Sequence, residues 1–215
     1  MQLIDFILHI DKHLHEFVIN YENWVYAILF LIIFVETGLV VMPFLPGDSL
    51  LFAAGAICAV SGTPELDNKG LNVWLLMVLL TLAAVLGDTI NYSIGKLFGT
   101  KLFGKFINPK HIKQTEEFFD KHGGKAIIYA RFAPFLRTFA PFVAGIGAMN
   151  YNRFLLYNFI GAFLWIFGIT LIGYFFGNIP FIKSNFKIVV IGIILLSLIQ
   201  PFIEVMKSRK ESKKA

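Results

Sequence analysis

Long apolar stretches alternate with short polar ones along the whole chain. The apolar stretches cover residues 24–60, 71–94, 126–149, 154–177 and 188–203. A helix of about 20 apolar residues crosses the hydrocarbon core of a bilayer, so these stretches have the length and character of membrane helices. The pattern therefore predicts an all-α integral membrane protein.

The polar stretches between them predict two amphipathic helices. Over residues 3–18, apolar side chains recur every three or four positions and charged side chains occupy the opposite face. A second such helix is expected between the start signal Asn108-Pro109 and the stop signal Gly123-Gly124. Both helices are expected to lie along a membrane surface.

The first apolar stretch carries charges and prolines that a plain membrane helix excludes. Its only charges are Glu36 and Asp48, and Pro43, Pro46 and Gly47 lie between them. Proline lacks a backbone donor and clashes with the preceding turn, so it ends a helix, whereas glycine permits a reversal. Because non-helical backbone at this depth must be covered by protein or water, we expect a re-entrant hairpin that faces a buried cavity.

The third apolar stretch repeats this design with the opposite charge. Its charges are Arg131 and Arg137. A charge at bilayer depth costs about 2.5–3.5 kcal/mol on insertion scales, so we interpret the charges of both hairpins as the functional site. The residues expected to shape the second hairpin are Pro134, Pro141 and Gly145.

The order of elements predicts one membrane domain that contains an internal repeat. Each half reads amphipathic helix, broken hairpin and spanning helix. The predicted parts are repeat 1 (residues 3–98, hairpin 24–60), repeat 2 (residues 109–178, hairpin 125–149), a C-terminal helix (186–206) and a basic tail (207–215).

Short sequence matches and the charge distribution support an inverted repeat. Pro43-Phe-Leu returns as Pro134-Phe-Leu, and Tyr92-Ser-Ile-Gly returns as Tyr174-Phe-Phe-Gly. Lysines gather between residues 96 and 125 and again in the tail, and such clusters mark the cytoplasmic side. The acidic hairpin is then expected to enter from outside and the basic hairpin from the cytoplasm, as in secondary transporters.

The composition excludes a soluble globular protein. Hydrophobic residues make up 57% of the chain and charged residues only 15%, with a net charge of +5. Soluble domains carry about a quarter charged residues. We expect no nucleic-acid partner, because the basic clusters have a topological explanation and no aromatic residues interleave with the tail.

The residues do not favour an enzyme. Cys58 is the only cysteine and lies in an apolar stretch, so we expect neither an intramolecular disulfide nor a thiolate zinc site. A lipid phosphatase normally needs a nucleophile and a general acid–base group at the phosphate. All the histidines lie outside the apolar stretches: His9, His13, His15, His111 and His122. We therefore expect no catalytic residue, cofactor or metal.

Arginines and carboxylates together suit the handling of a phosphate anion with protons. Arginine stays charged and its planar fork matches phosphate oxygens, whereas low dielectric favours the protonated form of a carboxylate. We expect the arginines to pair with the acids of the first hairpin until phosphate competes for them. An equally open role for Asp88 is that of a helix-terminal carboxylate, and the charges as a whole could simply hold the hairpins together. The predicted roles are phosphate binding for Arg131, Arg137 and Thr138, and proton coupling for Glu36, Asp48 and Asp88.

These residues resemble those of the DedA family, which is related to the eukaryotic VTT-domain lipid scramblases. The resemblance covers about residues 24–177. It implies a multi-pass protein of the bacterial cytoplasmic membrane that moves phospholipid-like substrates and is linked to the proton-motive force. The residues that carry it are Glu36, Pro43, Pro46-Gly-Asp48, Gly87-Asp88 to Tyr92, Gly95, Phe132-Ala-Pro134-Phe-Leu-Arg137, Pro141 and Gly145.

The resemblance and the charges together lead us to expect a proton-coupled flippase for a phosphate-bearing lipid such as undecaprenyl phosphate. The resemblance implies that Glu36 and Asp48 form the acidic pair and that Arg131 and Arg137 form the basic pair. The alternatives are a phosphatidylethanolamine flippase or scramblase, and a proton-coupled ion or small-solute antiporter. Expected partners are the lipid substrate, protons and membrane lipids, with a homo-oligomer left open.

Overall fold

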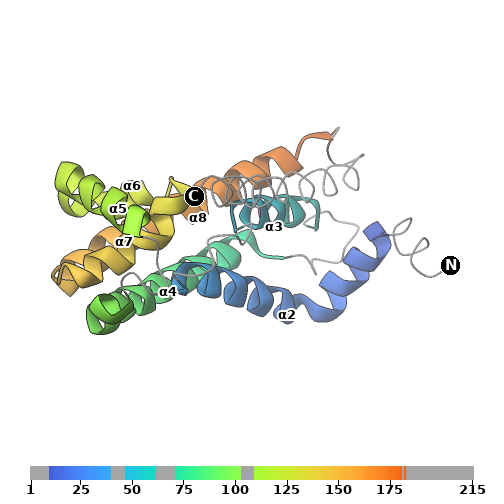
Figure 1. Ribbon diagram of the computed structural model, residues 1–215. Coiled ribbons are helices and arrows are strands. Elements are labelled where there is room, and N and C mark those ends of the chain that lie inside the picture. Colours follow the sequence, from blue (N-terminus) through green and yellow to red (C-terminus); the bar gives the residue numbers. More distant parts are fainter. Residues whose placement is uncertain (1–9, 40–46, 62–70, 103–108, 181, 183–215) are drawn as a thin grey trace, which may run out of the picture. The chain divides into compact units, whose positions relative to one another are not determined.

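The computed structural model describes residues 10–39, 47–61, 71–102, 109–180 and 182, which are helical over most of their length and contain no strand (Figure 1). This confirms the predicted all-α class for the part of the chain that is described. The long helices are α2 (Ile10–Gly38), α4 (Val73–Leu102) and α8 (Tyr151–Gly177). The shorter helices are α3 (Gly47–Ser61), α5 (Pro109–His122), the 3-10 helix η2 (Gly123–Lys125), α6 (Ala126–Ala130) and α7 (Pro134–Ile146).

The described helices belong to two compact units. Unit 1 contains α3 and the last part of α8. Unit 2 contains the last part of α2, nearly all of α4, all of α5 to α7 and the first part of α8. The bounds are Met1–Val25, Pro46–Val73 and Ile169–Ala215 for unit 1, and Tyr26–Leu45 and Trp74–Gly168 for unit 2.

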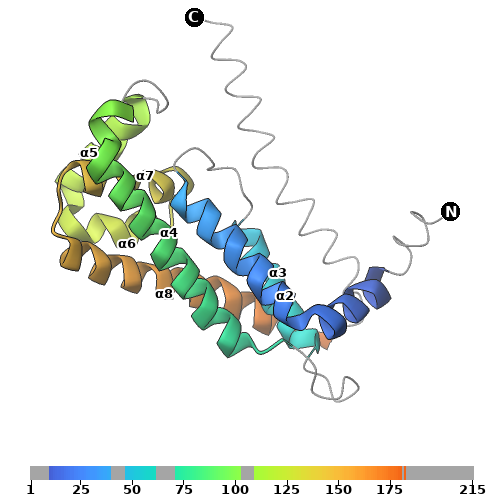
Figure 2. The same ribbon diagram turned by 90° about the horizontal axis from the view of Figure 1, so that it is seen from below.

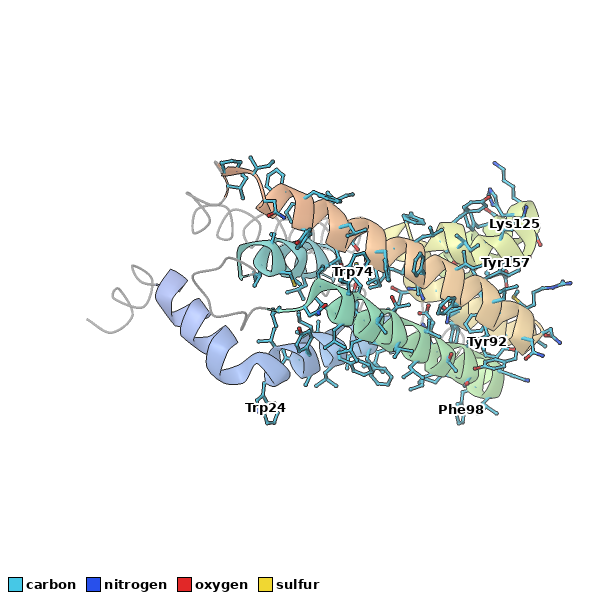
Figure 3. The ribbon with its side chains drawn as sticks, turned by 180° about the vertical axis from the view of Figure 1, so that it is seen from behind. Trp24, Trp74, Tyr92, Phe98, Lys125 and Tyr157 are labelled. Atoms are coloured by element: carbon cyan, nitrogen blue, oxygen red, sulfur yellow. The ribbon has the colours of Figure 1, made fainter. Side chains whose placement is uncertain are left out.

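The long helices α4 and α8 are built for a membrane. Residues Val73–Phe98 and Tyr151–Gly177 are long and apolar enough to span a bilayer. Aromatic side chains mark the two ends of α4, where Trp74 is 63% and Phe98 50% exposed, about 36 Å apart at 1.5 Å per residue. In Figure 3 the Phe98 ring points away from the helices. This spacing exceeds the hydrocarbon thickness of about 30 Å, as expected for anchors at two interfaces.

On α4 the polar side chains are buried and large apolar side chains are exposed, which is the reverse of a surface helix in a soluble protein. Its polar side chains Thr81, Asp88 and Asn91 are buried. In water such a face would be turned outward and the apolar face inward, so the surrounding medium of α4 is apolar. The exposed face carries Leu75, Val78, Leu82, Leu86 and Ile90, three or four positions apart.

The second predicted amphipathic helix is confirmed as α5. It begins at Pro109 and ends at His122, after which Gly123 takes the left-handed φ of +57° that ends a helix. Its apolar side chain Phe119 packs against Phe142 and Val143 of α7 rather than remaining free. Figures 1 and 2 show α5, α6 and α7 gathered where α4 ends and α8 begins.

Two helices extend beyond their predicted limits. Helix α2 runs from Ile10 to Gly38 through the expected boundary near residue 18, because residues 19–23 contain no glycine or proline. Helix α4 continues to Leu102 rather than ending at residue 94, so Asp88 lies at its middle and not near its inner end. Residues 3–9, the C-terminal helix (186–206) and the tail (207–215) lie outside the described residues.

The second hairpin is interrupted directly before its first proline, as predicted, and the prolines of the first hairpin lie outside the described residues. Helix α2 ends at Gly38 and α3 begins at Gly47, while Pro43 and Pro46 lie in the undescribed residues between them. In the second hairpin, Ala133 is extended (φ −117°, ψ 114°), which is the conformation that a following proline favours. Pro134 then opens α7.

Pro141 differs from the prediction that it shapes the reversal. It lies inside α7, which continues to Ile146. The fixed φ of proline is compatible with a helix, and the cost is one lost backbone hydrogen bond together with crowding of the carbonyl four residues earlier. The reversal of the second hairpin therefore depends on the turn before Pro134.

Two helix crossings have the same geometry, and the first lies in unit 2. Helices α4 and α7 meet through glycines whose missing side chains let the backbones touch. A Cβ added to Gly95 would lie 2.2 Å from the carbonyl oxygen of Phe142, and one added to Gly145 would lie 2.1 Å from that of Tyr92. Gly145 therefore fixes a close crossing and does not form the reversal predicted for it.

The second crossing lies in unit 1, between α3 and the end of α8. A Cβ added to Gly173 would lie 2.1 Å from the carbonyl oxygen of Phe52, and one added to Gly55 would lie 2.1 Å from that of Thr170. One hairpin leg from each half thus packs against the spanning helix of the other half.

These crossings give the predicted internal repeat a different register. Phe52-Ala-Ala-Gly matches Phe142-Val-Ala-Gly, and Ser93-Ile-Gly-Lys-Leu-Phe-Gly matches Leu171-Ile-Gly-Tyr-Phe-Phe-Gly. Tyr92 is therefore equivalent to Thr170, and the predicted match with Tyr174 is wrong by four residues. The error arose because tyrosine and glycine recur by chance in an apolar sequence, whereas backbone contact fixes the pairing.

We expect Gly145→Ala to destabilise the protein by about 1–3 kcal/mol or more, because its Cβ would meet backbone that cannot move aside. Gly168→Ala is the matched control, since nothing lies within 4 Å of its added Cβ and alanine favours a helix. Thermal unfolding of the purified protein in detergent measures both. Equal unfolding temperatures for Gly145→Ala and the unchanged protein would contradict the close crossing.

Candidate functional site

Four charged side chains are buried together in unit 2. Glu36 lies near the end of α2, Asp88 at the middle of α4, Arg131 in the turn after α6 and Arg137 in the second turn of α7. Their exposed fractions are 3%, 2%, 3% and 9%. Because charges are expensive to bury, each needs a partner from another element.

Each guanidinium has a carboxylate partner. Arg137 Nη2 donates to Glu36 Oε1 at 2.9 Å, and Arg131 Nη2 donates to Asp88 Oδ2. Arg131 Nη2 also donates to Asn158 Oδ1 at 2.5 Å. The predicted pairing between the hairpins is confirmed for Glu36, whereas Arg131 pairs with Asp88 on a spanning helix instead of with Asp48.

Helix α8 supplies an uncharged surface on which both arginines rest. The guanidinium carbons of Arg137 and Arg131 lie 4.7 Å and 5.8 Å from the centroid of the Trp165 ring, within cation–π range. Gly161 makes room for the stem of Arg131, since an added Cβ would lie 3.0 Å from Arg131 Cδ. Asn158, Gly161 and Trp165 share one face of α8 because they lie three and four positions apart.

Asn91 joins the backbones of the two hairpins. Its Nδ2 donates to the carbonyl oxygens of Thr37 (3.2 Å) and Thr138 (2.9 Å). These two threonines directly follow Glu36 and Arg137, so one amide fixes the backbone beside both members of an ion pair. The contact that the structure gives Thr138 here is made by its carbonyl, whereas the prediction assigned it to phosphate binding.

A glycine on α4 brings α2 close enough for these contacts. A Cβ added to Gly87 would lie 2.0 Å from Thr37 Oγ1 and 2.7 Å from the carbonyl oxygen of Phe34. The same approach places Glu36 beside the polar face of α4. Gly87 is therefore a packing residue of the site, as the small residues of membrane helices often are.

The arrangement can bind an anion without losing every internal contact. Within the part of the chain that is described, Arg131 Nε and Nη1 and Asp88 Oδ1 have no hydrogen-bond partner. Arg131 thus retains N–H donors beyond the group that holds Asp88. Donors in a site of low dielectric interact strongly with the oxygens of a phosphate or carboxylate.

Asp48 lies in the other compact unit. It occupies the first turn of α3 and is half-buried, where a carboxylate is favourable beside the helix N-terminus. The structure thus brings together Glu36, Asp88 and both arginines in one unit, and the role predicted for Asp48 stays a prediction.

Three members of the site were not predicted from the sequence, namely Asn91, Asn158 and Trp165. The two asparagines carried a usable signal, because strongly polar side chains inside apolar stretches usually face the interior of the bundle. Trp165 carried none, because an apolar membrane helix accepts tryptophan on any face. Within the described residues no group of three metal-ligating side chains occurs.

Comparison with known proteins identifies relatives along the whole chain. The sequence profile of the VTT domain matches residues 45–175. Protein DedA of Escherichia coli (strain K12) is 52% identical over 217 residues, which are 99% of this chain and 96% of that protein.

More distant relatives are also named as membrane proteins. An uncharacterized membrane protein of Mycobacterium tuberculosis (strain H37Rv) is 39% identical over 175 residues, 80% of this chain and 74% of that protein. Inner membrane protein YqjA of Escherichia coli (strain K12) is 36% identical over 161 residues, 72% of this chain and 69% of that protein. No solved structure matches the chain.

Proposed function

The chain belongs to the VTT-domain family, which includes the DedA membrane proteins, and on this premise we propose that it is a flippase for a phosphate-bearing lipid. Undecaprenyl phosphate in the bacterial cytoplasmic membrane is the proposed substrate. The observation that carries the proposal is the buried layer of two arginines and two carboxylates between apolar helices. Such a layer replaces the water that a lipid phosphate loses when it leaves the membrane surface.

The arginines are proposed to bind the phosphate. Arg131 has N–H donors to spare, and Arg137 contacts the Glu36 carboxylate and the Trp165 ring, which a phosphate can replace or share. A guanidinium fork matches two phosphate oxygens at once, which a lysine cannot do. The lipid tail would remain outside, in contact with the membrane.

Proton coupling would follow from the exchange of partners. When phosphate takes Arg137, Glu36 loses the opposite charge of that guanidinium at low dielectric, and a buried carboxylate with less opposite charge beside it binds a proton more readily. Asp88 can respond in the same way if Arg131 moves. Asp48 remains a proposed third proton carrier.

The repeat suggests how the site could open to each side in turn. We propose that the two hairpins are re-entrant and enter from opposite sides of the membrane, with the C-terminus in the cytoplasm. The equivalent crossings of α4 with α7 and of α3 with α8 support this plan, because repeats of one design can exchange conformations. Alternating access would then move the phosphate across the membrane.

Reconstitution of the full chain into vesicles tests the proposal. Vesicles would contain a labelled undecaprenyl phosphate analogue, and its arrival in the outer leaflet would be followed with and without a pH gradient. We expect a higher transport rate than in protein-free vesicles. The pH gradient should increase this rate, and a protonophore should return it to the rate measured without a gradient. No protein-dependent movement of this lipid would contradict the proposal.

Parallel measurements separate the other functions that the sequence left open. Movement of labelled phosphatidylethanolamine alone would indicate a phospholipid flippase or scramblase. Proton flux that depends on added cations and not on lipid would indicate an antiporter, and release of free phosphate would indicate an enzyme.

Trp165→Leu is expected to raise the lipid concentration for half-maximal transport about tenfold, because both arginines lose an aromatic face. Trp165→Phe keeps a ring and should fall in between. Trp74→Leu is the control, since Trp74 is 63% exposed and lies in the first turn of α4, about 21 Å along the helix from Asp88. An unchanged half-maximal concentration in Trp165→Leu would exclude this role of the indole.

A further inference from the structure

Asn91 has a buried oxygen that the described residues leave without a partner. The side chain is 0% exposed, and its Nδ2 uses both hydrogens on the carbonyl oxygens of Thr37 and Thr138. Its Oδ1 accepts no hydrogen bond from any described residue. Buried acceptors are nearly always satisfied, so this oxygen calls for an explanation.

The orientation of this amide is fixed by its neighbours. If the group were turned over, Oδ1 would face two carbonyl oxygens, and acceptors repel one another. The oxygen must therefore point away from Thr37 and Thr138. It is an acceptor only and cannot donate to a ligand.

The oxygen belongs to the same polar layer as the ion pairs. Asn91 follows Asp88 by three positions and so shares its face of α4. The carbonyls that it binds belong to the residues next to Glu36 and Arg137. Asn91 thus adds to this layer a neutral acceptor that no described residue already occupies.

Resting on the proposed function, we infer that Asn91 is a specificity-determining residue that accepts a hydrogen bond from the protonated oxygen of a phosphate monoester. The arginines donate to the unprotonated oxygens, and Asn91 receives the P–O–H group. A phosphodiester of the same single negative charge has no such hydrogen. The site would therefore distinguish a lipid monophosphate from an ordinary phospholipid without relying on charge.

The pH dependence of this preference follows from the monoester itself. A phosphate monoester loses its second proton near pH 6, so the P–O–H group is present below about pH 6 and absent well above it. The contribution of Asn91 should be largely present at pH 5.5, where about three quarters of the monoester carries the P–O–H group, and lost at pH 8.5. Above pH 6 the second negative charge of the monoester strengthens its binding to the arginines in every variant. The contribution of Asn91 to the preference is therefore measured as the difference between the unchanged protein and an Asn91 variant.

Binding of two probes with identical tails tests the inference. The probes are dioleoyl phosphatidic acid, a monoester, and dioleoyl phosphatidylmethanol, a diester whose head group has no hydroxyl, measured on the full chain in detergent at both pH values. At pH 5.5 we expect the unchanged protein to prefer the monoester about tenfold, as one well-made hydrogen bond allows. Asn91→Leu should abolish that preference, and the difference between the two proteins should vanish at pH 8.5.

Ser93→Ala is the matched control on the same helix. Its hydroxyl donates to the carbonyl oxygen of Thr89 within α4, so its loss should leave the preference unchanged. A preference that survives in Asn91→Leu would overturn the inference.

If Asn91→Leu does not fold, binding of the two probes to the unchanged protein still tests the inference. Equal binding of the two probes at pH 5.5 would mean that only water or an internal group satisfies the oxygen, which overturns the inference. The proposed function fails on a different result, namely normal lipid transport after loss of Arg137. The two failures are therefore distinguishable.

Discussion

Arg137→Ala is expected to reduce lipid transport at least about hundredfold while the protein still inserts into the membrane. The variant loses the fork that would hold two phosphate oxygens, and each hydrogen bond to a charged group contributes about 1.5–3 kcal/mol. The apolar spans that direct insertion are unchanged. The initial transport rate at matched protein content in vesicles measures the effect.

Two further variants make this result specific. Arg137→Lys keeps the charge without the fork and should retain only partial activity. Arg153→Ala is the matched control, because Arg153 is an exposed arginine in the first turn of α8. Lipid movement at the normal rate in Arg137→Ala would show that this arginine does not bind the phosphate.

Removal of one member of the Asp88–Arg131 pair is expected to destabilise the protein by about 3–5 kcal/mol. Either Asp88→Leu or Arg131→Leu leaves a charge buried without its partner. The double variant removes both charges and should recover most of the stability, because a buried pair is often no better than apolar residues of similar size. Chemical unfolding in detergent gives the three free energies.

Transport by the double variant separates a functional role from a structural one. If the pair binds substrate and exchanges protons, the double variant should be stable and inactive. If the pair only holds the helices together, the stable double variant should transport at the normal rate, contrary to our account. Glu117→Ala and Lys121→Ala are the surface controls, since both residues are exposed and such changes cost at most about 1 kcal/mol.

The breaks in the helices could be predicted because they depend on local chemistry. Pro134 forces extended backbone on Ala133 wherever the segment lies, and Gly123 ends α5 through its own φ. The limits of α2 and α4 were harder to predict, because polar residues and glycines are compatible with a helix that has close neighbours. Gly95 reads as a stop in the sequence, yet it is the position where α4 admits the backbone of Phe142.

The members of the site could be predicted better than their partners. Charges in an apolar stretch stand out because the membrane makes them costly, and four of the five predicted charges lie in one unit. Which acid meets Arg131 depends on where α4 passes the hairpins, and Gly87 decides this through a contact with Thr37 that no sequence pattern contains. The partner of Arg131 is therefore Asp88 of α4.

The repeat shows the same limit. Similar order of elements was readable from the sequence, but the register required backbone contacts at Gly95, Gly145, Gly55 and Gly173. Once these are known, the Phe-x-Ala-Gly segments of α3 and α7 align without a gap.

An electron cryo-microscopy map of the full chain in lipid nanodiscs with an undecaprenyl phosphate analogue would show whether the two arginines bind the lipid phosphate. We expect density for the phosphate within hydrogen-bond distance of Arg131 and Arg137, with the bond from Arg137 to Glu36 broken. Phosphate density only at the membrane surface, with both ion pairs intact at saturating lipid, would contradict the account.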